Sequence, residues 1–523
     1  MASDSNKNVR HLLEDRVAKT PDKPFLFSEI DGREWTYSEF DQVVNRTANM
    51  LRSHNIGKGD VVSLLLPNSA EYVIAYFACW KIGAIAGPVN SLLKPDEIEW
   101  VVRNSESKLI LLGSDWTASI ITCESAEHEN SFPDRVIFDD VIVAAAGHDD
   151  VLEPLELSSD DEAIIIYTSG TTGKPKGCLL THGNLLANAR QITDWMNFTE
   201  KDRLLSIMPL FHMNAVMVTT MTALYCSGST VVSPKFSASR FWDIIEKYQI
   251  TSFGSVATML SMLLASRESG VGSQEKEEDR LTTYPARLTT LRFAMCGSAP
   301  VPAEVLKKFE ETFGVLVIEG YGLSESTVRS TFNPPNEDRR PGSCGKPIGN
   351  EMKIFDEHDQ ELPDGELGEI VLRGPNIFKG YFKNPEATEK AFANGWFHTG
   401  DIGFRDADGF FYIADRKSDM IIRGGENIYP REIDDLLYTH PAVAAAAVLG
   451  VPDDLYGEEV AAFIVLKDKT NVTENDLIEF CKMHLADFKC PKTIHFVEDI
   501  PKGPTGKLLK RELAKLYAEA RTK

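Results

Sequence analysis

The sequence predicts an α/β fold with two parts: a large N-terminal domain built on layered, mostly parallel sheets, plus a small α+β C-terminal domain. A chain of 523 residues is too long for one hydrophobic core, so at least two domains are expected. Apolar, β-branched runs alternate with amphipathic helical segments over the first 150 residues, which is typical of βα units and parallel sheets. From about residue 361, short β-rich runs and tight turns replace this alternation.

The elements of the N-terminal part follow from hydrophobic periodicity. Phe40, Val43 and Thr47 fall on one helical face, at positions i, i+3 and i+7. Short apolar runs bounded by polar residues favour buried strands. In chain order we expect a helix from about Ser38, a strand at 60–66, a helix at 69–82, a strand at 84–89, a helix at 95–103 and a strand at 108–112.

A second, compact alternation near the C-terminus predicts the small domain. We expect a helix at 431–438, strands at 442–449 and 459–466, and a helix at 474–485. The polar segment 415–419 precedes these elements, so we assign residues 1–415 to the large domain and 416–523 to the small one. About 108 residues suffice for an independent domain.

The charge balance limits the partners. The formal net charge is −23, with 55 Lys and Arg against 78 Asp and Glu. A chain this acidic offers no broad basic face for nucleic acid or an anionic membrane surface, so we expect it to bind neither. Only the C-terminal end is basic, with seven Lys or Arg between residues 502 and 523.

Cysteine use and the N-terminus predict a cytoplasmic protein. The eight cysteines form no C-x-x-C pair, which favours reduced thiols over disulfides or a zinc site. The first residues lack the apolar core of a signal peptide. Residues 204–234 carry no charge, but Pro209, Asn214 and Gly228 interrupt any apolar span. There we expect a buried helix and strand beside a pocket rather than a transmembrane segment. The oligomeric state stays open between monomer and homodimer.

The densest motif lies at 167–177 (YTSGTTGKPKG), after the apolar run 163–166. Three glycines, four Ser or Thr hydroxyls and two lysines can direct N–H groups, hydroxyls and positive charge toward phosphate oxygens. The spacing departs from the P-loop pattern, because Pro175 stands where that pattern needs Gly-Lys. A polar surface turn is the alternative. We expect a phosphate-binding loop of another kind.

A second motif, 319–325 (EGYGLSE), combines glycines with an aromatic ring and a carboxylate. Gly320 and Gly322 leave room for a flat group beside Tyr321. Glu325 offers the hard oxygen ligand that Mg²⁺ prefers. An ordinary turn with an exposed glutamate is the alternative.

Two further motifs are weaker when taken singly. In 396–401 (WFHTGD), Asp401 can accept both hydroxyls of a ribose, although Asp often simply forms turns. In 501–511 (PKGPTGKLLKR), glycines and prolines hold a loop that presents Lys507, but most lysines in a basic tail are solvated.

Together, and in this order, the motifs resemble those of the adenylate-forming superfamily, which comprises acyl-CoA synthetases, nonribosomal adenylation domains and firefly-type luciferases. The resemblance covers nearly the whole chain, from about Trp35 to Arg511. It implies an ATP-dependent, AMP-forming acid–CoA ligase whose cofactors are ATP, Mg²⁺ and coenzyme A, with a small carboxylic acid as substrate. It also implies that the small C-terminal domain is mobile.

The resemblance assigns nucleotide-binding residues by position. The phosphates would contact Thr168, Ser169, Gly170, Thr171, Thr172 and Lys176. The adenine would lie among Ser298, Ala299, Pro300, Glu319, Gly320 and Tyr321, with Tyr321 stacking on the base, and Gly322 would also border the nucleotide. Near the α-phosphate, the ribose and the metal it implies Ser324, Asp401, Arg416 and Glu325, the last as the Mg²⁺ ligand.

The resemblance also implies two steps that share the small domain. Lys507 would bridge the substrate carboxylate and the α-phosphate, and no general base is needed. The CoA thiolate would then attack the acyl-AMP after rotation of the small domain. Rotation would bring Gly424 and Gly425 to the pantetheine tunnel, although this pair can also be a hairpin turn. At the hinge position Ser418 replaces the usual Asp or Lys.

The acid-binding pocket would include His212, the segments 213–220 and 323–327, and Gly297. This lining carries no fixed charge apart from Glu325, so we expect a neutral acid of small or medium chain length. His212 is a candidate catalytic residue, and an ordinary packed histidine is the alternative.

Three other functions are alternatives. Segments 237–242 and 423–427 resemble crotonobetaine/carnitine–CoA ligases, whose quaternary ammonium substrate would need an aromatic cage from Tyr225, Trp242 and Phe253. An acyl-AMP ligase that loads a carrier protein is the next alternative; such enzymes often carry an insertion, and the loop 270–279 is hydrophilic. A non-catalytic nucleotide-binding protein is the last.

Overall fold

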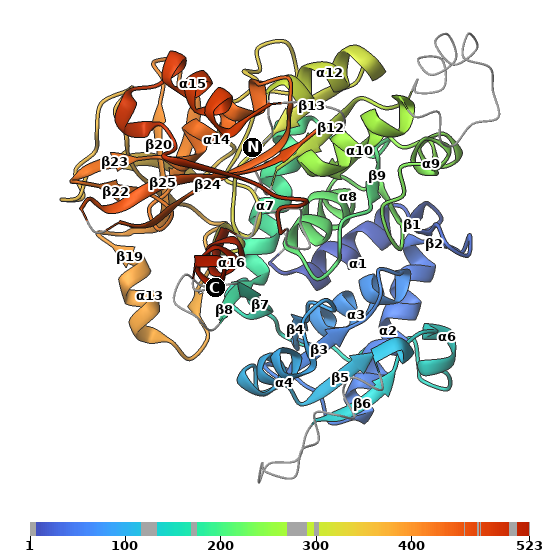
Figure 1. The fold of residues 1–523 in the computed structure, drawn as a ribbon. Helices are drawn as coiled ribbons and strands as arrows, with labels where there is room; N and C mark the ends of the chain where they lie inside the picture. Colours follow the sequence, from blue (N-terminus) through green and yellow to red (C-terminus); the bar gives the residue numbers. More distant parts are fainter. Residues whose placement is uncertain are drawn as a thin grey trace.

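The computed structural model describes residues 7–116, 133–168, 175–268, 290–297, 303–453, 455–467, 470, 472–501 and 510–521. Two seven-stranded sheets and the helices around them form the N-terminal part (Figure 1). A five-stranded antiparallel sheet follows, and a further five-stranded sheet with its own helices ends the chain. The predicted fold class, a large α/β part with mostly parallel sheets followed by a C-terminal domain, is confirmed.

The first sheet is built from the predicted βα units. Its order is β18-β8-β7-β4-β3-β5-β6, and the pairs from β7 through β6 are parallel. The antiparallel β7–β8 hairpin carries the glycine-rich motif between its strands. The strands are β3 (Val61–Leu65), β4 (Ile85–Pro88), β5 (Leu109–Leu112), β6 (Asp134–Ile137), β7 (Glu162–Thr168), β8 (Lys176–Thr181) and β18 (Gly380–Tyr381).

The second sheet has the order β13-β12-β11-β9-β10-β1-β2, and only the edge pair β1–β2 is antiparallel. Because the other strands are parallel, their carboxyl ends meet at one edge. The strands are β1 (Pro24–Ser28), β2 (Glu34–Thr36), β9 (Arg203–Ser206), β10 (Ser229–Val232), β11 (Ser252–Ser255), β12 (Phe293–Cys296) and β13 (Leu316–Glu319).

Helix α3 (Ala70–Lys81) joins the two sheets, since it contacts β1 of one and β3 and β4 of the other. All of its residues are buried, and Ser69 caps its first turn. One hydrophobic core therefore spans both sheets. The remaining helices of this part are α1 (Val9–Lys19), α2 (Tyr37–Ser53), α4 (Pro95–Asn104), α6 (Val141–Ala144), α7 (His182–Met196), α8 (Thr222–Tyr225), α9 (Phe241–Tyr248), α10 (Ala257–Glu268) and α12 (Ala303–Phe313).

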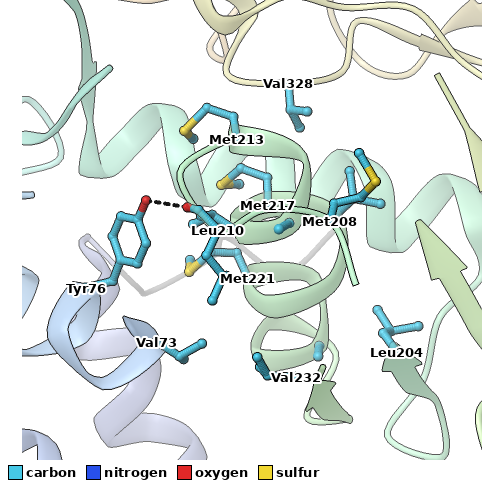
Figure 2. Packing of buried hydrophobic residues seen from close by; sticks show 14 of the residues in the cluster. Val73, Tyr76, Leu204, Met208, Leu210, Met213, Met217, Met221, Val232 and Val328 are labelled. Carbon is cyan, nitrogen blue, oxygen red and sulfur yellow. Dashed lines mark hydrogen bonds between the residues drawn. The ribbon is translucent and has the colours of Figure 1, made fainter. Parts of the chain in front are cut away.

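The uncharged segment 204–234 is the predicted buried helix and strand. Its helix, η2 (Asn214–Met221), is a π-helix whose residues are all buried. Hydroxyls satisfy the backbone of this wide turn: Thr219 and Thr220 donate to the carbonyl of Ala215 at 2.8 and 3.2 Å. Methionines of and around this helix form a buried cluster (Figure 2). In the part of the chain that the structure describes, no helix combines the length and apolar character needed to cross a bilayer.

The β-rich stretch after residue 361 belongs to an antiparallel sheet that the sequence patterns had not resolved strand by strand. Its order is β16-β17-β20-β19, and β21 pairs with β20. The elements of this region are η3 (Ser324–Ser326), β14 (Thr331–Phe332), β15 (Lys346–Pro347), β16 (Glu351–Phe355), β17 (Gly368–Arg373), α13 (Pro385–Ala391), β19 (Phe392–Ala393), β20 (Trp396–Arg405) and β21 (Phe411–Arg416).

The C-terminal sheet has two hydrophobic clusters of its own, formed by residues between 421 and 517. Its order is β23-β22-β25-β24, with β26 parallel to β25. The four elements predicted here are present. The elements are β22 (Ile421–Arg423), β23 (Glu426–Ile428), α14 (Pro430–Thr439), β24 (Val443–Asp453), β25 (Gly457–Leu466), α15 (Glu474–His484), η4 (Asp487–Lys489), β26 (Thr493–Phe496) and α16 (Lys510–Arg521).

Asp415, in β21, connects the antiparallel sheet to helix α14 of the C-terminal part. One carboxylate oxygen accepts from the backbone N–H of Arg416 at 2.7 Å, and the other accepts from the N–H of Arg431 at 2.9 Å. The Arg431 guanidinium also donates to the carbonyl of Ile413 at 2.7 Å. The division at 415/416 and the mobility of the small domain stay predictions.

Candidate active site

The glycines of the EGYGLSE motif lie where the chain packs on itself. A Cβ on Gly322 would stand 2.1 Å from the carbonyl oxygen of Val328, and one on Gly320 would stand 2.4 Å from the ring of Phe332. Only glycine fits both positions. The protein's own packing therefore requires these residues, in addition to any room they leave for a ligand.

Two predicted site residues, Tyr321 and Arg416, lie against a third, Asp401. The hydroxyl of Tyr321 donates to Oδ2 of Asp401 at 2.6 Å. Arg416 is the strand partner of Asp401, and its Nε lies 3.5 Å from Oδ1. Tyr321 and Asp401 are buried whereas Arg416 is exposed. This arrangement presents an acceptor and a cation on adjacent strands.

Glu325 lies in a second group, next to the first. The hydroxyl of Tyr381 donates to Oε1 of Glu325 at 3.0 Å. The ammonium of Lys176 lies 5.1 Å from the centre of the Tyr381 ring. Burial raises the pKa of Glu325, and Asp401 and Arg416 are close enough to act on that pKa in opposite directions. The two groups thus form one site.

The carboxylate of Glu325 can serve as the single protein ligand of a metal that also takes phosphate oxygens. Among the residues described, no three His, Cys, Asp or Glu side chains gather into a metal cluster. Mg²⁺ usually binds proteins through one or two carboxylates plus substrate phosphates and water. The donor set at Glu325 fits that mode and does not fit a cage made only of protein ligands.

Glu319 is the last residue of β13 and therefore lies at the edge of the second sheet where the carboxyl ends of the parallel strands meet. Its side chain is buried, and its Oε2 accepts from the N–H of Gly342 at 3.0 Å. Burial raises the pKa of Glu319 to about 8. A carboxyl that stays protonated near neutral pH can donate as well as accept a hydrogen bond.

His212 follows β9, and the carbonyl of Pro209 accepts from its N–H at 3.0 Å. Burial lowers the pKa of His212 to about 4, so the ring is neutral at pH 7. Its Nε2 is buried without a hydrogen-bond partner among the residues that the structure describes. The ring is therefore a neutral group with an unsatisfied polar atom, not a cation.

Arg329 was missed by the sequence analysis. Its guanidinium is buried, and Nη2 lies 2.7 Å from where a Cβ on Gly297 would stand. Burial lowers the pKa of Arg329 to about 10, so it keeps its charge at neutral pH. The signal in the sequence was a single arginine in the otherwise uncharged run 326–333.

Gly424 and Gly425 form the turn between β22 and β23, so the hairpin reading is correct. Their φ angles are +59° and +93°, in the region that favours glycine. Arg423 beside them pairs with Glu459 and stacks 4.1 Å from the centre of the Tyr456 ring. A tunnel at this turn stays a prediction.

Several predicted positions lie in or beside described elements, and others lie outside the described residues. Thr168 ends β7 and faces Lys176 across the hairpin, and Ser324 begins η3. The hydroxyl of Ser418 donates to Asp419 at 2.9 Å. Outside the described residues lie the loop 270–279, Ser169, Gly170, Thr171, Thr172, Ser298, Ala299, Pro300 and Lys507.

The three rings suggested for an aromatic cage are used in packing. The ring centroid of Phe241 lies 4.9 Å from that of Phe253 and 4.8 Å from that of Trp242. Tyr225 lies under the guanidinium of Arg16, 5.9 Å from its ring centre. A cage made of these three rings stays a prediction.

Comparison with known proteins identifies relatives along nearly the whole chain. A family model described as AMP-binding enzyme matches residues 13–382, and one described as AMP-binding enzyme C-terminal domain matches residues 432–507. The chain is 35% identical over 522 residues to an oxalate–CoA ligase of Arabidopsis thaliana, covering 97% of this chain and 98% of that protein. It is 33% identical over 528 residues to a crotonobetaine/carnitine–CoA ligase of Proteus mirabilis, covering 97% and 99%.

A solved structure gives the same result for the fold. ATP-bound MatB from Rhodopseudomonas palustris matches with a TM-score of 0.88 and 30% identity, covering 98% of this chain and 99% of that chain.

Proposed function

The chain belongs to the AMP-binding enzyme family, and from this premise we propose which residues carry out its reaction and which acids it activates. The reaction is that of an AMP-forming acid–CoA ligase, which uses ATP and CoA. In the first step a carboxylate oxygen bonds to the α-phosphorus of ATP and diphosphate leaves. In the second step the CoA thiolate attacks the acyl carbon, the acyl–oxygen bond to AMP breaks, and AMP leaves.

The observation that supports these roles best is the joint placement of Tyr321, Asp401 and Arg416 beside Glu325 and Lys176. A carboxylate and a cation on adjacent strands suit the hydroxyls and phosphate of a nucleotide. Asp401 and Arg416 hold the ribose, and Tyr321 contacts the adenine while its hydroxyl orients Asp401.

The remaining nucleotide contacts follow from the motifs. Lys176, at the start of β8, lies next to the glycine-rich loop and neutralises the terminal phosphates together with Thr168 and its neighbours. Glu325 holds Mg²⁺, which supplies fixed positive charge to the phosphate oxygens when bound. Ser324 approaches the α-phosphate, and Glu319 and Gly320 border the adenine.

Two anions must meet in the first step, so positive charge placed in advance lowers the barrier most. Lys507 provides it at the junction between the substrate carboxylate and the α-phosphate. After the small domain turns, Gly424 and Gly425 border the pantetheine arm of CoA, because a backbone without side chains leaves the space it needs.

The acid is a carboxylate of small or medium chain length. The neutral His212 and the wholly buried π-helix η2 form the proposed walls, and side chains already packed this closely leave limited volume. A crotonobetaine/carnitine-type substrate is less well supported, since the proposed cage rings are occupied in packing. A carrier protein as the acyl acceptor is the other alternative.

The test is diphosphate release from ATP and Mg²⁺ with a panel of carboxylic acids, followed by AMP release with and without CoA. We expect diphosphate with at least one acid and multiple turnovers only when CoA is present. Turnover with an acyl carrier protein but not with CoA would support the carrier-loading alternative. The absence of any diphosphate release or ATP–diphosphate exchange would refute the proposed function.

A further inference from the structure

Arg329 is a buried cation whose hydrogen bonds are largely unused. The residue is 1% exposed. Within the described part of the chain, Nε and Nη2 have no hydrogen-bond partner. Nη1 reaches only the neighbouring carbonyl of Val328, at the long distance of 3.4 Å. The guanidinium otherwise stacks on Phe332, with Cζ 5.3 Å from the ring centre.

Among the residues that the structure describes, no carboxylate pairs with Arg329. The group that acts most on it besides burial is the thiol of Cys296, and burial raises the pKa of that thiol to about 12, so it is neutral. Asn188 bonds to the backbone N–H and carbonyl of Arg329, at 3.2 and 2.7 Å, and thereby fixes the chain without pairing the charge. A buried ion without a partner costs several kcal/mol. Such a cost is expected where a ligand supplies the missing anion.

Arg329 also contacts a residue of the proposed acid pocket. Its guanidinium faces Gly297, which follows β12, with Nη2 2.7 Å from where a Cβ on Gly297 would stand. Its Cα packs against Gly322, a proposed nucleotide-binding residue that directly precedes the pocket segment 323–327. The preceding residue, Val328, belongs to the buried cluster with Met213 and Met217 of the π-helix region (Figure 2). The charge is thus enclosed by the elements that would surround the acyl chain.

We infer that Arg329 binds a second anionic group of the acid, so that the enzyme selects small acids carrying two negative charges. One carboxylate of the substrate reacts with ATP, and the other anion, a carboxylate or a sulfonate, accepts hydrogen bonds from the guanidinium. The planar fork of arginine suits either oxyanion. A neutral acyl chain would leave the cation buried and unpaired. This inference rests on the proposed function and replaces the neutral acid expected from the sequence with a dianionic one.

The experiment compares isosteric acids in pairs. For the purified full-length enzyme, kcat/KM for diphosphate release is measured with malonate against 3-methylbutyrate, succinate against 4-methylpentanoate, and sulfoacetate against 3,3-dimethylbutyrate. We expect at least one dianionic acid to exceed its partner by at least about 10²-fold, because a site built for a polar group rejects an analogue that lacks it. The first two pairs test a carboxylate and the third tests a sulfonate.

Variants then test whether Arg329 is the cause. In Arg329→Met, kcat/KM for the preferred dianionic acid should fall by about 10²- to 10³-fold, the loss typical of truncating one member of a buried charge pair. The preference within the pair should disappear or invert. Arg329→Lys keeps the charge without the fork and should retain part of the preference. Thermal unfolding of both variants checks that each is folded.

Arg203→Met is the matched control. Arg203 is another arginine whose pKa is lowered by burial. It lies at the amino end of β9, whereas Arg329 lies beside Gly297, at the carboxyl end of the parallel strand β12. Its guanidinium donates to the carbonyl of Tyr248 at 2.7 Å. It should leave the acid preference unchanged. If the wild-type enzyme releases diphosphate from ATP with equal efficiency in the presence of either member of every pair, or if Arg329→Met lowers kcat/KM for all acids alike, the inference is wrong while the proposed function stands. If no acid supports diphosphate release from ATP, the proposed function itself is refuted.

Discussion

Lys81 and Arg329 are two basic side chains buried to nearly the same degree, at 2% and 1% exposure, and their surroundings differ. The ammonium of Lys81 lies 2.6 Å from Asp41 and 3.9 Å from Glu14. Arg329 has no carboxylate partner among the residues described. The comparison indicates that a buried cation with a structural role is paired with a carboxylate of the protein itself. For Arg329 we infer that the anion comes from the bound substrate.

The largest effect is expected at Lys81. Lys81→Met leaves Asp41 without its cation in a mostly buried position, and breaking a buried pair in this way costs about 3–5 kcal/mol. Urea unfolding at neutral pH measures the loss. A destabilisation below about 1 kcal/mol would mean that the Lys81–Asp41 pair contributes little and that the comparison has no basis.

Glu319 is a buried acidic residue that can be compared with Lys81 and Arg329. Because its pKa is raised, it stays protonated and uncharged near neutral pH. Its folded-state pKa of about 8 is raised above the ordinary value of 4.5 by burial, so the folded state binds the proton more tightly than the unfolded state. The stability this provides is complete below pH 4.5 and is lost as the pH rises toward 8. Glu319→Gln mimics the protonated form, and its stability relative to wild type should therefore increase by about 2–4 kcal/mol between pH 5 and 8. If the free energies of unfolding of Glu319→Gln and wild type changed equally between pH 5 and 8, the raised pKa of Glu319 would be contradicted.

In the proposed mechanism Lys507 is a cation of the small domain that reaches the active site for the first step and is not permanently buried there. Lys507→Ala should lower adenylate formation by at least about 10²-fold, or roughly 2.7 kcal/mol, the typical loss of one stabilising group. Thioester formation from supplied acyl-AMP should largely persist. Diphosphate release and thioester formation are measured separately. Equal damage to both steps would assign Lys507 a structural role.

The smallest effect has the opposite sign. Arg329→Met replaces an unpaired buried charge with a shorter, unbranched apolar side chain, so the free enzyme should become about 1–2 kcal/mol more stable. Thermal unfolding without substrate gives this value. A loss of more than 1 kcal/mol would show that the guanidinium supports the fold, as Lys81 does.

Much of the fold was predictable because its signals are local. The strands at β3, β4 and β5 and the helix α3 follow from apolar runs and helical periodicity, and their boundaries agree with prediction to within one or two residues. The approach of Tyr321 to Asp401 was predictable only through the family resemblance, since 80 residues separate them in the chain.

Other features depend on tertiary packing and leave little trace in a single sequence. The close contact of Gly322 with the carbonyl of Val328 comes from two segments that fold back on each other. The antiparallel order of β16, β17, β20 and β21 depends on register between distant strands. The burial of Arg329 is of this kind too, because an arginine is normally exposed and only its neighbours in space reveal that it is not.

The bond between Asp415 and Arg431 has a consequence for the balance between conformations. A hydrogen bond to a carboxylate contributes about 1.5–3 kcal/mol, which corresponds to a population ratio of roughly 10 to 150. The rotation proposed for the small domain would break this contact, so the contact favours the arrangement described above. An exchange of ligands that differ by a few kcal/mol in their affinity for the two orientations is enough to overturn the ratio. Weakening this bond, for example by Asp415→Asn, should shift the resting enzyme toward the orientation proposed for thioester formation.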